Sequence, residues 1–78
     1  MKINIAILGS TGSIGENILD IVRKDKKNLK VVLLTANNNY KKLIQQAKEF
    51  KVKNIQIYND KYYEFSKIEL KGRKINIF

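Results

Sequence analysis

The stretch that decides the fold of this chain is Gly9-Ser10-Thr11-Gly12-Ser13-Ile14-Gly15. It follows a short apolar run, Ile5 to Leu8, of the kind that forms a strand buried on both faces in a parallel sheet. It opens a segment in which apolar residues recur at helical spacing. That helical face is expected to comprise Ile14, Ile18, Ile21 and Val22, widened by Leu19. The stretch therefore predicts a tight turn from a buried strand into an amphipathic helix.

Each glycine of residues 9–15, the glycine loop, has its own expected role. Gly9 can adopt backbone angles closed to other residues, Gly12 lets a pyrophosphate approach the backbone, and Gly15 lets the helix pack near the sheet. The free N–H groups and positive dipole end of the helix then hold phosphate oxygens, and Thr11 and Ser13 can add hydroxyl donors. The spacing is Gly-x-x-Gly-x-x-Gly rather than the commoner Gly-x-Gly-x-x-Gly, so the strand-to-helix context carries the prediction. The alternative is a turn without a ligand.

Residues 31–58 are predicted to form a strand, a helix and another strand. The apolar run Val31 to Leu34 is the first strand, and an alternating stretch, Asn54 to Tyr58, is the second. Between them a helix begins near Tyr40. Its inward face is expected to consist of Tyr40, Leu43, Ile44, Ala47 and Phe50, and its solvent face of Lys41, Lys42, Gln45, Gln46 and Lys48.

Residues 59–78 give weaker signals. Asn59 and Asp60 supply a turn or a helix N-cap, and residues 71–73 supply another turn before a strand at 75–78. Residues 62–70 are a helix candidate in which Tyr62, Phe65 and Ile68 share a face, from which Tyr63 and Leu70 depart. Alternation of strands and helices predicts an α/β fold, a Rossmann-type parallel sheet with right-handed crossovers and flanking helices. The expected order is an incomplete β-α-β-α-β-α-β.

Composition narrows the possible chemistry. The 78 residues make at most one domain and include neither cysteine nor histidine, which removes disulfides, thiolate metal sites and the commonest general base. The net charge is +9, but basic residues are scattered along the chain among acidic ones, which favours a solvated basic surface over a polyanion site. No apolar run approaches the ~20 residues of a membrane span, and no signal peptide is recognisable. A soluble, unprocessed chain is expected.

The end of the second strand is where dinucleotide-binding folds contact the cofactor ribose. A site for NAD generally carries Asp or Glu there, about 20 residues beyond the glycines. This chain instead has Ala36, Asn37, Asn38 and Asn39, followed closely by two lysines. Without a carboxylate a 2′-phosphate is not repelled, and amide groups and lysines can hold it. The pattern favours NADP over NAD, although an asparagine-rich turn that caps the next helix explains the same residues.

The glycine loop, with Ile5 to Leu8 before it and Leu19-Asp-Ile-Val-Arg23 after it, resembles the N-terminus of the 1-deoxy-D-xylulose 5-phosphate reductoisomerase family. Residues 31–39 and 46–50 fall where that family has its second strand and second helix. The resemblance implies an NADPH- and divalent-metal-dependent (Mg or Mn) enzyme of non-mevalonate isoprenoid biosynthesis. Such enzymes rearrange 1-deoxy-D-xylulose 5-phosphate and reduce the product to 2-C-methyl-D-erythritol 4-phosphate.

By position, the resemblance also implies which residues bind the cofactor. The implied NADPH site consists of Gly9, Thr11, Gly12, Ser13, Ile14, Gly15, Ala36, Asn37, Asn38 and Asn39. Many relatives have Gly-Lys-Asn or a similar basic triplet at the second strand's end, so Asn38 replaces a frequent cation. Family members are several times longer, and their metal-binding, substrate-phosphate and lid residues lie beyond this region. Residues 1–78 are therefore expected to be the N-terminal part of an NADP-binding domain, without catalytic or metal-binding residues of its own.

Several further expectations follow from the resemblance. The acids Glu16, Asp20 and Asp25 are expected to face solvent, and the chain alone is expected to bind nucleotide without catalysing. A sugar-phosphate substrate, a homodimer and a cytoplasmic location, or a plastid-type organelle in a eukaryote, are expected of the full-length enzyme. We expect neither nucleic acid nor a membrane as partner.

Two alternatives stay open at this point. Other NAD(P)-dependent oxidoreductases, such as semialdehyde dehydrogenases and dihydrodipicolinate reductases, have related loops, but their typical Gly-Ala-Thr-Gly or Gly-Arg-Met is missing here. A basic nucleic-acid-binding module would need aromatic side chains among the basic residues of one exposed face. Tyr58, Tyr62, Tyr63 and Phe65 cluster in the sequence but fit the edge of a core equally well.

Overall fold

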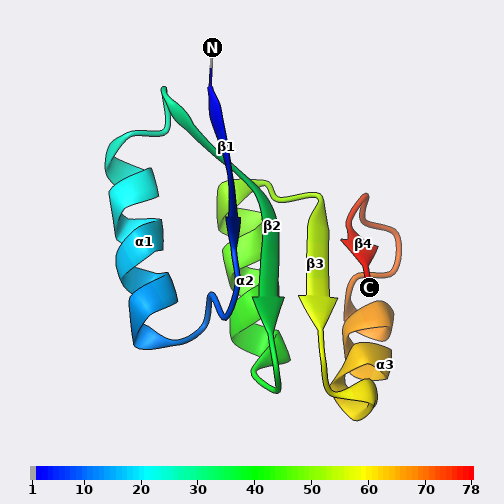
Figure 1. The fold of residues 1–78 in the computed structure, drawn as a ribbon. Helices are drawn as coiled ribbons and strands as arrows, with labels where there is room; N and C mark the ends of the chain where they lie inside the picture. Colours follow the sequence, from blue (N-terminus) through cyan, green and yellow to red (C-terminus); the bar gives the residue numbers. More distant parts are fainter. Residues whose placement is uncertain (1) are drawn as a thin grey trace.

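Residues 2–78, the part that the computed structural model describes, form four parallel strands and three helices (Figure 1). The strands lie in the order β1-β2-β3-β4. Their bounds are β1 Ile3–Ile7, β2 Leu29–Ala36, β3 Asn54–Ile57 and β4 Asn76–Ile77, and those of the helices are α1 Ser13–Lys24, α2 Tyr40–Phe50 and α3 Asp60–Glu69. The predicted alternation of strands and helices, and the parallel sheet, are confirmed.

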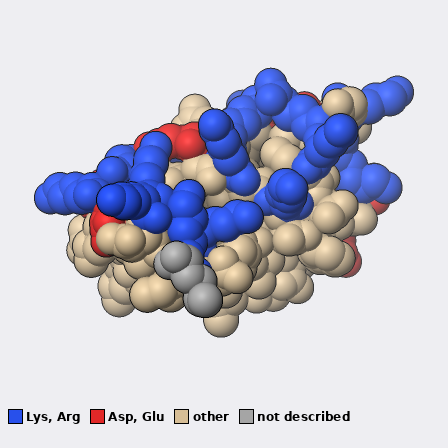
Figure 2. All heavy atoms as spheres, turned by 90° about the horizontal axis from the view of Figure 1, so that it is seen from above, with Lys and Arg blue, Asp and Glu red and all other residues tan. Residues whose placement is uncertain are grey.

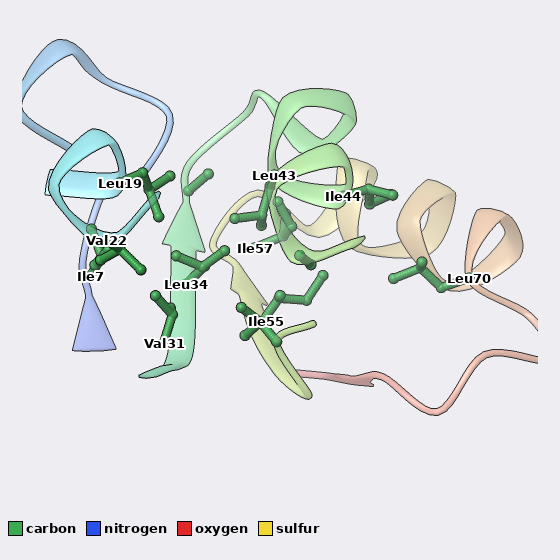
Figure 3. Close-up of a cluster of buried hydrophobic side chains, with 13 residues drawn as sticks. Ile7, Leu19, Val22, Val31, Leu34, Leu43, Ile44, Ile55, Ile57 and Leu70 are labelled. Atoms are coloured by element: carbon green, nitrogen blue, oxygen red, sulfur yellow. The ribbon is translucent and has the colours of Figure 1, made fainter. Parts of the chain in front are cut away.

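The helices all pack on the same face of the sheet (Figure 3). Each helix returns the chain to the start of the next parallel strand, so the carboxyl ends of β1, β2 and β3 lie at one edge (Figure 1). The register between β1 and β2 shifts after Ile5, and beyond the shift Ile7 pairs with Leu34. The glycine loop and the asparagines that follow β2 therefore meet at the carboxyl edge of the sheet.

The core lies between the sheet and the helices (Figure 3). Leu34 and Ile55 of the two central strands are fully buried, as are Leu19 of α1 and Leu43 of α2. The complete set of buried apolar residues is Ile7, Leu19, Val22, Val31, Leu34, Ala36, Leu43, Ile44, Ala47, Val52, Ile55, Ile57 and Leu70. The inward face predicted for α2 is confirmed, with Tyr40 and Phe50 half-buried at its ends.

The face predicted for α1 is only partly right. Its buried residues are Gly15, Leu19 and Val22, whereas Ile14 and Ile21 are 76% and 60% exposed. The reason is that Gly15 touches the loop backbone, and this contact sets the rotation of the helix about its axis. Leu19 and Val22, four and seven positions after Gly15, then point into the core.

Strand β1 was expected to be buried on both faces, and this prediction is wrong for the described residues. Within residues 2–78 β1 lies at the edge of the sheet and pairs with β2 alone. Because the helices cover one face, Ile5 and Ile7 pack toward the core, whereas the alternating residues Ala6 and Leu8 are exposed, Leu8 to 71%.

The face predicted for α3 is only partly right: Tyr62 and Phe65 share a face, with ring centroids 6.0 Å apart and both rings against Tyr40 of α2, but this face is not the buried one. Ser66 and Leu70 are buried, whereas Phe65 and Ile68 are 42% and 73% exposed. Aromatic packing between helices explains the difference, since the ring of Tyr62 stacks on Tyr40 of α2 with centroids 5.4 Å apart. That contact turns α3 so that Ser66 and Leu70 enter the core.

Basic side chains from distant parts of the sequence gather where the strands begin, at the end opposite the glycine loop (Figure 2). A groove at this end is lined by Lys2, Val22, Lys26, Leu29, Lys30, Val31, Glu49, Phe50, Lys51 and Lys53. None of the helices formed by residues 2–78 combines the length and apolar character that a membrane crossing requires.

Candidate nucleotide-binding site at the glycine loop

The glycine loop begins with a sharp turn that β2 holds in place. Gly9 has φ of +71°, in the left-handed region that favours glycine, as the sequence predicts. Its N–H donates to Thr35 Oγ1 at 2.9 Å, and the N–H of Ser10 donates to the carbonyl of Thr35 at 2.9 Å. Strand β2 therefore fixes the first half of the loop through both the side chain and the backbone of one residue.

Gly15 is required by the fold itself. A Cβ at this position would lie 2.5 Å from the Cα of Ser10 and 2.7 Å from the carbonyl oxygen of Gly9. These are backbone atoms and cannot move aside independently. The predicted role of Gly15, close packing of the first helix, is confirmed.

Gly12 has no comparable requirement. It has φ of −80° and ψ of 174°, angles open to other residues. A Cβ there would meet only the carbonyl oxygen of Gly9, at an ordinary 3.6 Å. The fold thus leaves room beside Gly12, and its predicted role toward a pyrophosphate stays a prediction.

The first turn of α1 differs from those of the other helices. Asn39 caps α2, its Oδ1 accepting from the N–H of Lys42 at 3.3 Å, and Asn59 caps α3, accepting from the N–H of Lys61 at 3.0 Å. The N-cap of α1 is Gly12, which has no side chain to do this. Its uncapped N–H groups and positive dipole end are suited to an anion.

The predicted phosphate-binding residues, except Thr11, line a shallow pocket at this turn. Gly12, Ser13 and Ile14 are exposed and Thr11 is half-buried. The pocket, of about 390 Å³, is lined by Ala6, Ile7, Leu8, Gly9, Gly12, Ser13, Ile14, Gly15 and Ile18. It joins the polar turn to apolar side chains of β1 and α1, so a ligand with a charged and an apolar part matches its lining.

The four residues predicted to contact the ribose are placed in different ways. The side chain of Ala36 lies in the core, and its carbonyl accepts from the N–H of Tyr58 at 3.1 Å. Asn38 Oδ1 accepts from Asn59 Nδ2 at 2.9 Å, while Asn37 is exposed at the rim. Asn39 caps α2, as the alternative interpretation of this turn proposed. An amide side chain at 37 is thus open to solvent, whereas those at 38 and 39 already have partners.

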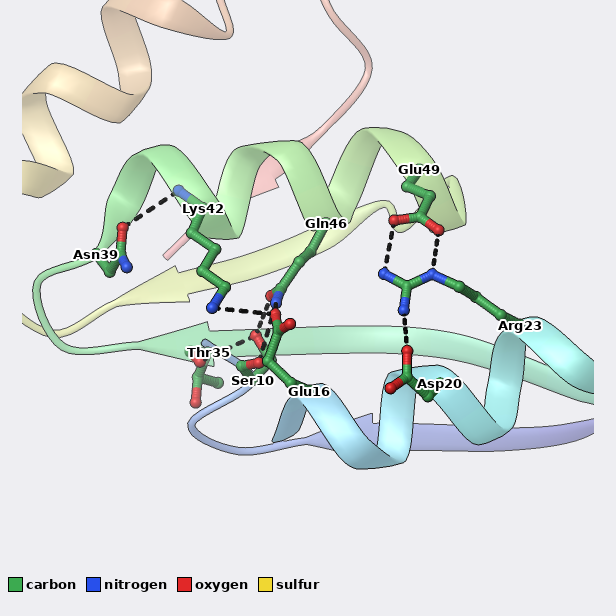
Figure 4. Close-up of polar contacts among 9 residues, drawn as sticks. All are labelled: Ser10, Glu16, Asp20, Arg23, Thr35, Asn39, Lys42, Gln46 and Glu49. Atoms are coloured by element: carbon green, nitrogen blue, oxygen red, sulfur yellow. Dashed lines mark hydrogen bonds and ion pairs between the residues drawn. The ribbon is translucent and has the colours of Figure 1, made fainter. Parts of the chain in front are cut away.

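Three residues that the sequence did not single out connect the loop to the rest of the fold (Figure 4). They are Ser10, Thr35 and Gln46, all buried. The prediction that Gln46 lies on the solvent face of α2 is wrong, since its side chain is buried and only 4% exposed. Its spacing from Leu43 and Phe50, three and four positions, is the signal that places it on the inward face. Among the residues described, no buried side-chain nitrogen or oxygen lacks a hydrogen-bond partner.

The acids of α1 were expected to face solvent, and for Glu16 this is only partly true. Its Oε1 accepts from Gln46 Nε2 at 2.7 Å and lies 3.3 Å from Lys42 Nζ. Asp20 is exposed and bonded to Arg23 (Figure 4). No three histidine, cysteine, aspartate or glutamate residues between positions 2 and 78 converge on a point where a metal ion would bind.

A second polar contact joins α1 to α2 away from the loop. Arg23 Nη2 donates to Glu49 Oε1 at 2.9 Å, and its Nε donates to the other carboxylate oxygen. The hydrogen bond from Arg23 holds the pKa of Glu49 below its usual 4.5, against a smaller opposing effect of burial. The same bond raises the pKa of Arg23. This ion pair supports the arrangement of the two helices that frame the glycine loop.

Comparisons with known proteins agree on one family. The family model described as 1-deoxy-D-xylulose 5-phosphate reductoisomerase matches residues 5–78. The enzyme of that name from Pelagibacter ubique is 49% identical over 74 residues, which cover 95% of this chain and 19% of that protein. The one from Porphyromonas gingivalis is 46% identical over 78 residues, covering 100% of this chain and 20% of that protein.

Solved structures of the same enzyme have the same fold. The Zymomonas mobilis enzyme in complex with NADPH aligns with a TM-score of 0.92 at 32% identity, over 99% of this chain and 20% of that one. A DOX-P reductoisomerase in complex with magnesium aligns with a TM-score of 0.91 at 29% identity, again over 99% of this chain and 20% of that one. This chain spans about one fifth of the length of the curated relatives that it matches.

Proposed function

The chain belongs to the 1-deoxy-D-xylulose 5-phosphate reductoisomerase family, and from that membership we propose that it forms an NADPH-binding portion of such an enzyme. The observation that carries the proposal is the uncapped first turn of α1 behind the glycine loop. Its support is the similarity, at a TM-score of 0.92, to a relative solved with NADPH. In the proposed complex the N–H groups of this turn hold the cofactor's pyrophosphate.

The residues present fit such a cofactor at two points. The open space beside Gly12 admits a phosphate close to the backbone, where a Cβ would intrude on the ligand without disturbing the fold. Asn37 and the backbone after β2 lie at the same edge, where the ribose 2′-phosphate is proposed to bind. Bound there, NADPH supplies the hydride for a reduction, and this chain's residues orient the cofactor's adenosine and pyrophosphate parts.

The activity of the longer enzyme is part of the same proposal. We infer that it converts 1-deoxy-D-xylulose 5-phosphate to 2-C-methyl-D-erythritol 4-phosphate, using a divalent metal and acting as a homodimer. The described residues contain no cluster of metal ligands, so we assign neither the metal nor a catalytic step to any residue of this chain. Residues 1–78 alone are proposed to bind nucleotide without catalysing.

Titration with NADPH tests the proposed function. The nicotinamide fluorescence should change when the chain is added, and Gly12→Val should abolish this response while the circular dichroism spectrum keeps its helical signal. Asn17→Val, at an exposed position of α1, is the control and should bind as the unsubstituted chain does. A chain that leaves NADPH fluorescence unchanged would overturn the proposal, and so would undiminished binding by Gly12→Val.

A further inference from the structure

We infer that Gln46 is a positioning residue of the nucleotide site, which holds the glycine loop in its binding shape and keeps the carboxylate of Glu16 turned away from the phosphate position. The inference rests on the proposed function for the identity of the ligand. The hydrogen bonds that carry it are independent of any ligand (Figure 4).

One amide binds both the side chain and the backbone of the same loop residue. Gln46 Oε1 accepts from the hydroxyl of Ser10 at 2.8 Å, and Gln46 Nε2 donates to the carbonyl of Ser10 at 3.0 Å. Two bonds in opposite directions fix both the position and the orientation of the peptide group that follows Ser10. The α2 helix thereby holds the loop from one side, while Thr35 of β2 holds it from the other.

The residue type indicates a purpose beyond filling the core. Gln46 is 4% exposed, and its neighbours on the same helix face, Leu43 and Ala47, are fully buried. An apolar side chain would fill this space without the desolvation penalty that a buried amide carries. What the amide adds is a donor and an acceptor together, and they match the backbone carbonyl and the hydroxyl of Ser10.

The third hydrogen bond acts on charge. Glu16 lies in the first turns of α1, close to the N–H groups proposed to bind phosphate. Gln46 Nε2 and Lys42 Nζ both contact its Oε1, at 2.7 and 3.3 Å. Both contacts come from α2, so they draw the carboxylate toward that helix, and the lysine offsets its charge. Without them a free carboxylate would repel the cofactor's phosphates.

Gln46→Leu tests this role, with Gln45→Leu as the matched control. Gln45 is the preceding residue of α2 and is exposed, so the same substitution there leaves the loop untouched. Two quantities are measured for each variant: the backbone amide resonances of Gly9, Gly12 and Gly15 without nucleotide, and the dissociation constant for NADPH. In Gln46→Leu the glycine resonances should shift, and the dissociation constant should rise roughly five-fold, the loss expected from about one net hydrogen bond.

The outcomes separate this inference from the proposed function. If Gln46→Leu remains folded with unmoved glycine resonances, the positioning role is wrong, whether or not the unsubstituted chain binds NADPH. An unsubstituted chain that does not bind NADPH counts against the proposed function alone. A purely structural role would lower the unfolding midpoint but leave the affinity of the folded fraction unchanged, which would also overturn the inference.

If Gln46→Leu does not fold, Gln46→Glu takes its place. When ionised, it keeps the acceptor for the Ser10 hydroxyl, lacks the donor and places a second carboxylate beside Glu16, so the same resonance shifts and a larger loss of NADPH affinity are expected.

Discussion

Ser10 and Gly15 touch through their backbones, and a Cβ at residue 15 would lie 2.5 Å from the Cα of Ser10. Ser10 is completely buried and is held by hydrogen bonds from β2 and α2, so it cannot retreat. The contact fixes both the distance of α1 from the sheet and its rotation. It thereby determines that Leu19 and Val22, rather than Ile14 and Ile21, enter the core.

Gly15→Ala should therefore destabilise the chain. The added methyl group overpacks a contact between backbone atoms, which costs about 1–3 kcal/mol in the free energy of unfolding. Urea unfolding followed by circular dichroism measures this difference. Gly12→Ala is the matched control, because its Cβ meets ordinary space and its backbone angles suit alanine. Equal stability of the two variants would mean that the close contact at Gly15 is not rigid.

Local sequence was sufficient to predict the order of elements and the position of the loop. Gly9, Gly12 and Gly15 lie between an apolar run and an amphipathic segment, and this pattern has few structural solutions. The face of α2 was also predictable, because Leu43, Ile44 and Ala47 are spaced for one helix face and lack competing apolar residues opposite.

Features that depend on contacts between elements were not predictable in this way. The apolar residues of α1 form a wide stripe, so the spacing allows more than one rotation of the helix, and the contact between Gly15 and Ser10 selects which part of the stripe is buried. Gln46 resembled a solvent residue because its partners, Ser10 and Glu16, are 36 and 30 residues away in sequence. The edge position of β1 follows from strand order, which periodicity does not encode.

Thr35→Val should loosen the start of the glycine loop. Valine keeps the shape and strand preference of threonine but removes the acceptor for the N–H of Gly9, now bonded at 2.9 Å. Leaving this partly buried donor unpaired costs about 1–3 kcal/mol. Hydrogen exchange at the Gly9 amide should become faster in Thr35→Val and stay slow in Thr35→Ser, which retains the hydroxyl. Equal protection in both variants would show that the side-chain oxygen does not hold the loop.

The contact between Arg23 and Glu49 predicts a pH dependence of stability. The hydrogen bond from Arg23 lowers the pKa of Glu49 in the folded state. The contact therefore stabilises the fold fully at a pH above the pKa that Glu49 has in the unfolded chain. This stabilisation is lost as the pH falls through the lower pKa of the folded chain. Stability should therefore change with pH below about pH 4.5, the usual pKa of a glutamate side chain. Both side chains are more than one third exposed, so the effect should stay below about 1 kcal/mol.

Unfolding of Glu49→Gln in urea at pH 7 and pH 3 measures this contribution. The variant should be less stable than the unsubstituted chain at pH 7, and the difference should be smaller at pH 3, because the carboxylate of Glu49 takes up a proton as the pH falls through its lowered pKa. Molar salt at pH 7 should also reduce the difference, because it screens exposed charges. A difference that is the same at both pH values would assign the effect to packing rather than to charge.

Asn38→Lys should increase the preference for NADPH over NADH. Asn38 is exposed in the turn proposed to face the ribose 2′-phosphate, and its one side-chain bond, to Asn59 at 2.9 Å, lies at the surface. Losing that bond should cost little, whereas a lysine adds a positive charge near a phosphate that only NADPH carries. A gain of about 1 kcal/mol from such a partly exposed pair corresponds to roughly a five-fold tighter dissociation constant for NADPH.

The ratio of the two dissociation constants separates this effect from a general change in the loop. NADH affinity should be unchanged in Asn38→Lys, and the gain for NADPH should shrink as salt is added, since it comes from charge. Gln45→Lys, which adds the same charge at an exposed position of α2 beyond the turn, serves as a control for net charge. Tightening of both cofactors by the same factor would place the 2′-phosphate elsewhere, and the asparagines after β2 would then act only as a helix cap and a turn.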